Sequence, residues 1–143
     1  MQSEEVVARG SFSSGEDWEI TATIVPDDVM TILSVTRQGA QVFGGGMGGP
    51  PVWDGQVMNL YWGLEDGFLG LVIRVVDPDV RLWVTVRSAD PHELFLHPIP
   101  RRPEIRVAAF GLTATGSTPV SVSAEDERGE TLATFTVPGA AFS

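Results

Sequence analysis

Apolar and polar residues alternate most regularly between Val80 and Arg87. The even-numbered positions from 80 to 86 are valine or leucine, whereas the odd-numbered positions from 81 to 87 are arginine, tryptophan and threonine. This period of two, with many β-branched residues, predicts a strand with one buried face. A second β-rich run, residues 68–76, precedes it across Asp77-Pro78-Asp79. We therefore expect these two runs to form a hairpin.

The same alternation recurs along most of the chain, and no segment of ten or more residues keeps a helical period. Short connections rich in glycine, proline and aspartate separate the runs. The pattern predicts an all-β protein of about nine or ten strands in a single antiparallel β-sandwich of Ig-like or Greek-key type. We expect residues 1–143 to form one domain, since a chain of this length can bury a sufficient core. The other expected strands are residues 5–13, 18–25, 29–37, 57–63, 94–97, 104–112, 118–124 and 130–137.

Residues 38–56 interrupt this pattern with seven glycines and two prolines. Glycine loses much conformational entropy when it is fixed in a strand, and proline has no N–H to donate to a neighbouring strand. This composition therefore argues against a central strand. The segment also contains Phe43, Met47 and Trp53, whereas flexible linkers lack large apolar residues. We therefore expect one long loop that folds over an edge or an end of the sheets.

The composition of the chain limits which partners and which cellular compartment we expect for the protein. The net charge is −10, and all nine basic residues are arginine. An acidic domain is repelled by phosphate backbones and anionic lipids, so we expect no nucleic-acid binding and no membrane insertion. The chain has no cysteine, which removes disulfides and thiolate chemistry, and no cofactor is expected. The acidic N-terminus predicts a cytoplasmic protein, with export by a removed signal peptide as the open alternative.

Acidic turns raise a calcium hypothesis. If successive connections alternate between the two ends of the sandwich, one end gathers several carboxylates, and calcium takes six to eight oxygen ligands. The spacing matches no EF-hand loop, and aspartate is also ordinary in exposed turns. The calcium candidates are Asp27, Asp28, Asp66 and Asp90.

Catalytic patterns are absent from the sequence. The two histidines, His92 and His97, belong to no nucleophile-elbow motif, and the proximity of Ser88, Asp90 and His92 in sequence does not establish a triad. The glycine tract resembles a phosphate loop only superficially, because the chain has no lysine and no following helix. No catalytic residue is therefore assigned.

Aromatic residues give the more useful signal for binding. Trp83 shares a strand face with Arg81, opposite the valine and leucine face, so it is either exposed or covered by the glycine-rich loop. Exposed tryptophan and arginine are enriched in protein interfaces, and an aromatic face also suits a sugar ring. The candidate binding residues are Trp83, Arg81, Arg87, Trp53 and Tyr61.

Three stretches, GSFSSGEDWEITA, FGGGMGG and GFLGLVIRVVDPDVRLWVTV, carry a resemblance across roughly residues 8–132. With them the chain resembles the small, mostly uncharacterised β-sandwich domains of high-GC actinobacterial genomes. The resemblance implies an actinobacterial or actinophage origin, and it carries no functional residue over to this chain.

These observations lead to a ranked set of functions. The first is a non-enzymatic protein-interaction or assembly module, acting as an accessory subunit or as a homo-oligomer. The second is a lectin-like carbohydrate-binding domain, with calcium as an optional ligand. A hydrolase is the third.

Overall fold

The computed structural model describes residues 4–87, 89–113 and 119–137, and these residues form twelve strands and no helix. All pairings between neighbouring strands are antiparallel. The strands are β1 (Glu4–Ser11), β2 (Asp17–Val25), β3 (Asp28–Arg37), β4 (Ala40–Met47), β5 (Asn59–Glu65), β6 (Phe68–Val75), β7 (Arg81–Val86), β8 (His92–Leu94), β9 (His97–Ile99), β10 (Arg102–Thr113), β11 (Val120–Glu125) and β12 (Thr131–Thr136).

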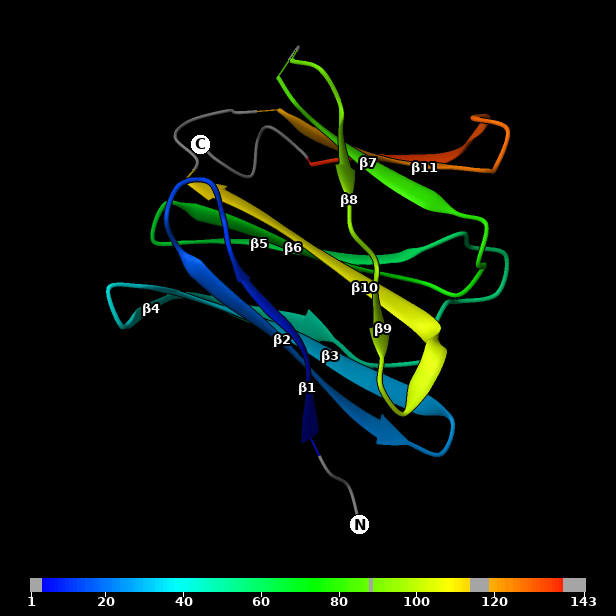
Figure 1. Cartoon of the computed structure of the whole chain (residues 1–143), viewed down its shortest axis with the longest axis horizontal. Coiled ribbons are helices and arrows are strands. Elements are labelled where there is room, and N and C mark those ends of the chain that lie inside the picture. Colours follow the sequence, from blue (N-terminus) through cyan, green and yellow to red (C-terminus); the bar gives the residue numbers. More distant parts are fainter. Residues whose placement is uncertain (1–3, 88, 114–118, 138–143) are drawn as a thin grey trace.

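The strands form three stacked sheets of four (Figure 1). Sheet A has the order β1-β2-β3-β4, sheet B the order β5-β6-β10-β9, and sheet C the order β12-β11-β7-β8. Sheet B is the middle layer, because one buried cluster joins it to sheet A and another joins it to sheet C. The all-β antiparallel class is confirmed. The Ig-like sandwich type and the count of nine or ten strands are not, since there are three sheets and twelve strands.

The middle layer explains why the hairpin prediction for residues 68–87 is wrong. Strand β6 pairs with β5 and β10, whereas β7 pairs with β11 and β8. All eight residues of β6 are buried, because Phe68 and Val72 pack against sheet A while Leu69 and Leu71 pack in the cluster shared with sheet C. A strand covered on both faces has no polar face to alternate with. Asp77-Pro78-Asp79 therefore connects two sheets.

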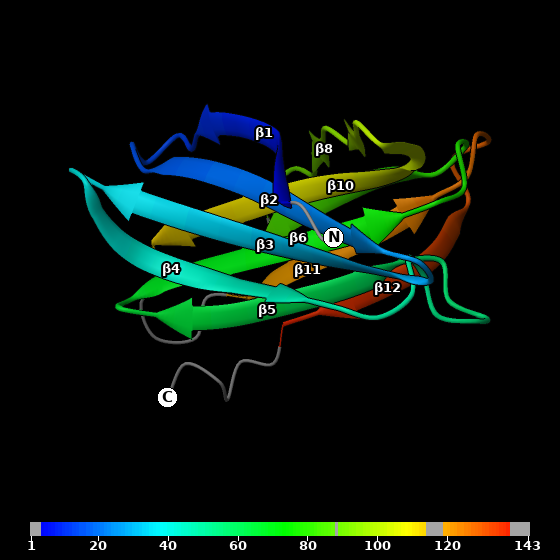
Figure 2. The same cartoon turned by 90° about the horizontal axis from the view of Figure 1, so that it is seen from below.

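The glycine-rich segment also differs from its prediction, because residues 40–47 form strand β4 at the edge of sheet A. Glycine is required there by close packing. A Cβ at Gly46 would lie 1.9 Å from the backbone oxygen of Thr31, and one at Gly45 would lie 2.7 Å from the ring of Tyr61. Of the predicted loop, residues 38–39 form the turn between β3 and β4, and residues 48–56 belong to the connection from sheet A to sheet B, which extends to Met58 (Figure 2).

Candidate functional site

Trp83 and Arg81 lie on the outer face of sheet C, beside the short edge strand β8. The inward neighbours Leu82 and Val84 are fully buried, whereas Trp83 is half-buried and Arg81 is exposed. The guanidinium carbon of Arg81 lies 5.3 Å from the centre of the Trp83 ring, within the range of a cation–π contact. The strand parity expected from the sequence therefore places both side chains on one surface.

Glu93 of β8 completes this surface. Arg81 donates to both carboxylate oxygens of Glu93, from Nε at 2.8 Å and from Nη2 at 2.7 Å. These hydrogen bonds lower the pKa of Glu93 and raise that of Arg81. The fork geometry orients both side chains beside the indole, so the polar part of the surface is fixed without being buried.

The indole nitrogen of Trp83 is a buried donor that has no hydrogen-bond acceptor among the described residues. A buried donor without an acceptor costs free energy. A hollow of about 310 Å³ lies beside this ring. It is lined by Trp83, Thr85, Pro91, Ser123 and Glu125.

Phe95 is the most exposed large apolar side chain of the described residues, at 72%. It lies between β8 of sheet C and β9 of sheet B, where the chain passes from one sheet edge to the next (Figure 1). Its ring centre is 4.7 Å from that of His97, which in turn is 5.6 Å from Trp18 of sheet A. Burial lowers the pKa of His97, which favours its neutral form. A line of rings thus follows this side of the stack.

Sequence reasoning missed Phe95, although a signal for it was present. Leu94 and Leu96 flank it and both pack partly against the core shared by sheets B and C. In an extended segment, two inward residues separated by one position force the residue between them outward. We call Arg81, Trp83, Glu93 and Phe95 the β7–β9 surface.

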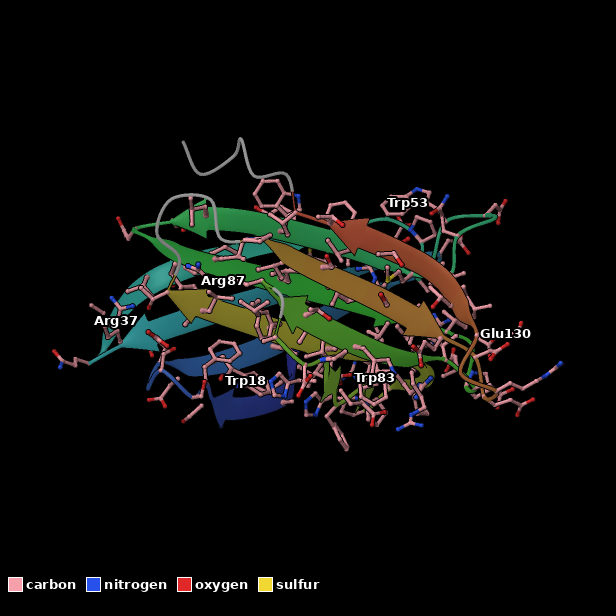
Figure 3. All side chains as sticks on the ribbon, turned by 90° about the horizontal axis from the view of Figure 1, so that it is seen from above. Trp18, Arg37, Trp53, Trp83, Arg87 and Glu130 are labelled. Atoms are coloured by element: carbon pink, nitrogen blue, oxygen red, sulfur yellow. The ribbon has the colours of Figure 1, made fainter. Side chains whose placement is uncertain are left out.

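The other predicted binding residues lie elsewhere. Tyr61 of β5 is partly buried between sheets A and B, against Gly45. Trp53 is 49% exposed on the connection from β4 to β5, beyond the β12 edge of sheet C, whereas Trp83 lies toward the opposite edge (Figure 3). Arg87 is exposed at the end of β7, with φ at 57°. The five residues predicted from the sequence therefore do not form one site.

The glycine-rich segment does not supply the cover considered for Trp83. Its connecting part borders β5 and β12, because Trp53, Gln56 and Val57 share a hollow with Leu60 and Phe135. The hollow beside Trp83 is lined by β7, β11 and Pro91 instead.

The acidic turns are not gathered at one end. Asp28 is the first residue of β3, and its charge acts on Arg74. Asp66 is in the β5–β6 turn, which lies at the opposite end of the stacked sheets (Figures 1 and 2). No group of three or more histidine, aspartate or glutamate side chains could hold a metal ion within residues 4–87, 89–113 and 119–137. The structure thus offers no ligand set that includes Asp27, Asp28, Asp66 and Asp90. Ser88, considered with Asp90 and His92, lies outside the described residues.

Two buried charged residues were also missed. Arg74 and Glu16 are each at most 1% exposed, and each is surrounded by hydrogen-bond partners. Arg74 interrupts an otherwise apolar run, which was the available signal. Glu16 lies in a turn of ordinary polar composition, so no sequence pattern indicates that it is buried.

Comparisons with protein-family models, with curated proteins and with solved structures find no match to this chain. Within the part of the chain that is described, no helix is long and apolar enough to cross a membrane.

Proposed function

We propose that this chain is a non-enzymatic protein-interaction module that docks through the β7–β9 surface. The observation that supports the proposal most is the 72% exposure of Phe95 beside a fixed Arg81–Glu93 pair. Burying a phenylalanine side chain contributes about 1.5–3 kcal/mol, so this ring gains free energy when a partner covers it. Aromatic and arginine side chains at the centre of a polar rim are the usual composition of a binding hot spot.

The partner is either another protein, for which this chain is an accessory subunit, or a second copy of the chain. Strands β8 and β9 lie at sheet edges, and an edge strand presents backbone groups to an opposing strand, although three residues each allow few such hydrogen bonds. A partner that covers Phe95 and stacks on Trp83 would bury both rings together.

Sedimentation equilibrium of the full chain, with and without Phe95→Ser, tests the homo-oligomer form of the proposal. A dimer or higher species that reverts to monomer in the variant is the expected result. For a different partner, a photo-crosslinking amino acid at position 95 should trap one protein in the native host. That protein, once purified, should bind the wild type at least about tenfold more tightly than Phe95→Ser. If the chain is a monomer and position 95 traps nothing above the level of exposed Met30, the proposal fails.

A lectin-like domain is the second candidate, and the hollow beside Trp83 favours it. An indole, two hydroxyl side chains and the carboxylate of Glu125 line this hollow, which is the mixture of groups that recognises a sugar ring. A glycan panel read by tryptophan fluorescence separates the two functions. Quenching that is lost in Ser123→Val but kept in Phe95→Ser would favour the lectin.

A further inference from the structure

A second apolar surface lies on the opposite side of the stack, between the β4–β5 connection and β12. Two adjoining hollows of about 440 and 460 Å³ share Trp53, Gln56 and Val57 as lining residues. Three of the six exposed large apolar side chains among the described residues line the second hollow. These three are Trp53 at 49%, Leu132 at 44% and Val76 at 36% exposure.

The backbone around Trp53 is fixed by hydrogen bonds to two buried side chains. The side-chain oxygen of Asn59 accepts from the backbone nitrogen of Trp53 at 3.1 Å, and its amide nitrogen donates to Pro50 and Pro51. Arg74 donates to the backbone oxygens of Gly48, Pro50 and Pro51. Asn59 and Arg74 are both almost fully buried. Trp53 is thus an exposed ring on a fixed backbone, which lowers the entropy lost on binding.

Strand β12 forms one wall of the first hollow, through Ala133, Thr134 and Phe135. It is the edge strand of sheet C, and among the described residues it pairs only with β11. The other side of an edge strand presents backbone donors and acceptors to a further strand. A peptide added there would place alternate side chains toward Trp53 and Phe135.

The charge around the hollows indicates the chemistry of the occupant. Asp54 and Asp77 line the second hollow, no arginine lines either one, and no ion pair between described residues engages these two carboxylates. Two copies that met groove to groove would set Asp54 and Asp77 against their own counterparts, and like charges oppose association. A segment with basic residues at the end beside these carboxylates fits this surface better.

We infer that this groove binds an extended apolar segment of another protein, with lysine or arginine at one end, which adds to sheet C as a fifth strand beside β12. The apolar side chains of the segment would cover Trp53, Val57 and Phe135. Its basic end would lie near Asp54 and Asp77, which both line the second hollow. This site is separate from the β7–β9 surface.

Selection from a displayed library of random twelve-residue peptides tests the inference. The library is panned on the immobilised full chain after depletion on Trp53→Ala, and enriched peptides are synthesised and titrated by calorimetry. We expect alternating apolar residues with lysine or arginine at one end. Trp53→Ala should weaken binding about tenfold or more, which is the effect of losing a hot-spot aromatic. Asp54→Lys should weaken it several-fold, and more at low salt.

Two matched controls make the test specific. The synthetic peptide is methylated on its backbone nitrogens at either the odd or the even positions. Only one of these two forms should lose binding, because β12 pairs with one edge of the added strand. Phe95→Ser should bind as the wild type does, which separates this site from the β7–β9 surface. Absence of any enriched peptide, enrichment of acidic peptides, or equal binding of both methylated forms would overturn the inference.

Discussion

Arg74 and Arg81 are seven residues apart in sequence and show two different uses of the same side chain. Arg74 is fully buried in the middle sheet and makes six hydrogen bonds to neutral oxygens, from 2.9 to 3.3 Å. Arg81 is exposed and makes its two bonds to one carboxylate. Burial lowers the pKa of Arg74 to about 10, the nearby charge of Asp28 partly opposing this, whereas Glu93 raises the pKa of Arg81.

This difference between the two arginines assigns Arg74 to the stability of the fold and Arg81 to the recognition of a partner. The acceptors of Arg74 come from β3, from β4 and from the connection after it, so one side chain joins two sheets and fixes the backbone under Trp53. Arg81 joins only two neighbouring strands of one sheet and remains accessible to a partner. We expect changes at Arg74 to act through folding and changes at Arg81 to act through binding. Four variants, ordered from the largest expected effect to the smallest, test this contrast and extend it to two other buried polar side chains.

Arg74→Met should give the largest loss of stability, at least about 3 kcal/mol, because five backbone oxygens and the Thr31 hydroxyl would lose a charged hydrogen-bond donor inside the protein. The measurement is urea unfolding at pH 7, followed by circular dichroism. Arg74→Lys is the matched control, since it keeps the charge but offers three donors in place of five. We expect it to recover part of the loss. A change below about 1 kcal/mol in Arg74→Met would contradict the role assigned to this residue.

Glu16 is intermediate between the two arginines, because its buried carboxylate pairs with the partly exposed Arg37. Its carboxylate accepts from Ser14, from Arg37 at 2.8 Å and from Thr113 at 3.3 Å, and so joins sheet A to β10 of sheet B. The hydrogen bond from Ser14, followed by that from Arg37, lowers its pKa from 4.5 to about 2, although burial opposes the shift. The stabilisation is therefore present above pH 4.5 and is lost as the pH falls from 4.5 toward 2.

Glu16→Gln should cost roughly 1.5–3 kcal/mol at pH 7, since hydrogen bonds to a charged group are lost. It should also flatten the dependence of unfolding free energy on pH in this acid range. Denaturant titrations at several pH values measure both effects. The exposed Glu130 offers a control, because Glu130→Gln should leave the acid slope nearly unchanged.

The sequence predicted the strand class well wherever one face of a strand meets water. Strands β2, β3 and β7 alternate because each has an inward and an outward face. The prediction of two sheets was wrong at β6, where every position is buried and the period of two carries no information. Residues 68–75 form a nearly continuous apolar run, which is typical of a strand covered on both sides.

The candidate site was predictable only in part. Parity placed Arg81 and Trp83 on the outer face of their strand, and the structure has them there. Whether Glu93 and Phe95 lie beside these two residues depends on the path of the short connection from sheet C to sheet B. The alternation of apolar and polar residues does not predict that path. The prediction of a loop at residues 40–47 was wrong because composition measures the entropy cost of glycine but not the packing it permits against Tyr61 and Thr31.

Asn59→Ala should cost about 1–2 kcal/mol, because a nearly buried side-chain amide with three hydrogen bonds is removed. It should also speed hydrogen exchange of the Trp53 amide, which is the donor to Asn59. Exchange at Trp83 should not change, since β7 is held by other strands. Asn59→Asp is the matched control: it keeps the acceptor for Trp53 and removes the donors to Pro50 and Pro51. Protection of Trp53 that survives in Asn59→Ala would mean that Arg74 alone fixes this backbone.

Arg81→Met should have the smallest effect on folding and the clearest effect on binding. Exposed ion pairs contribute little to stability because water and salt screen them, and methionine keeps much of the apolar contact with the Trp83 ring. We expect a thermal midpoint within error of the wild type, with or without added salt. Binding of the partner trapped at position 95 should weaken, since both the fork to Glu93 and the charge beside the indole are lost. If instead Arg81→Met unfolds as readily as Arg74→Met, the contrast between the two arginines is wrong, and the β7–β9 surface is part of the scaffold.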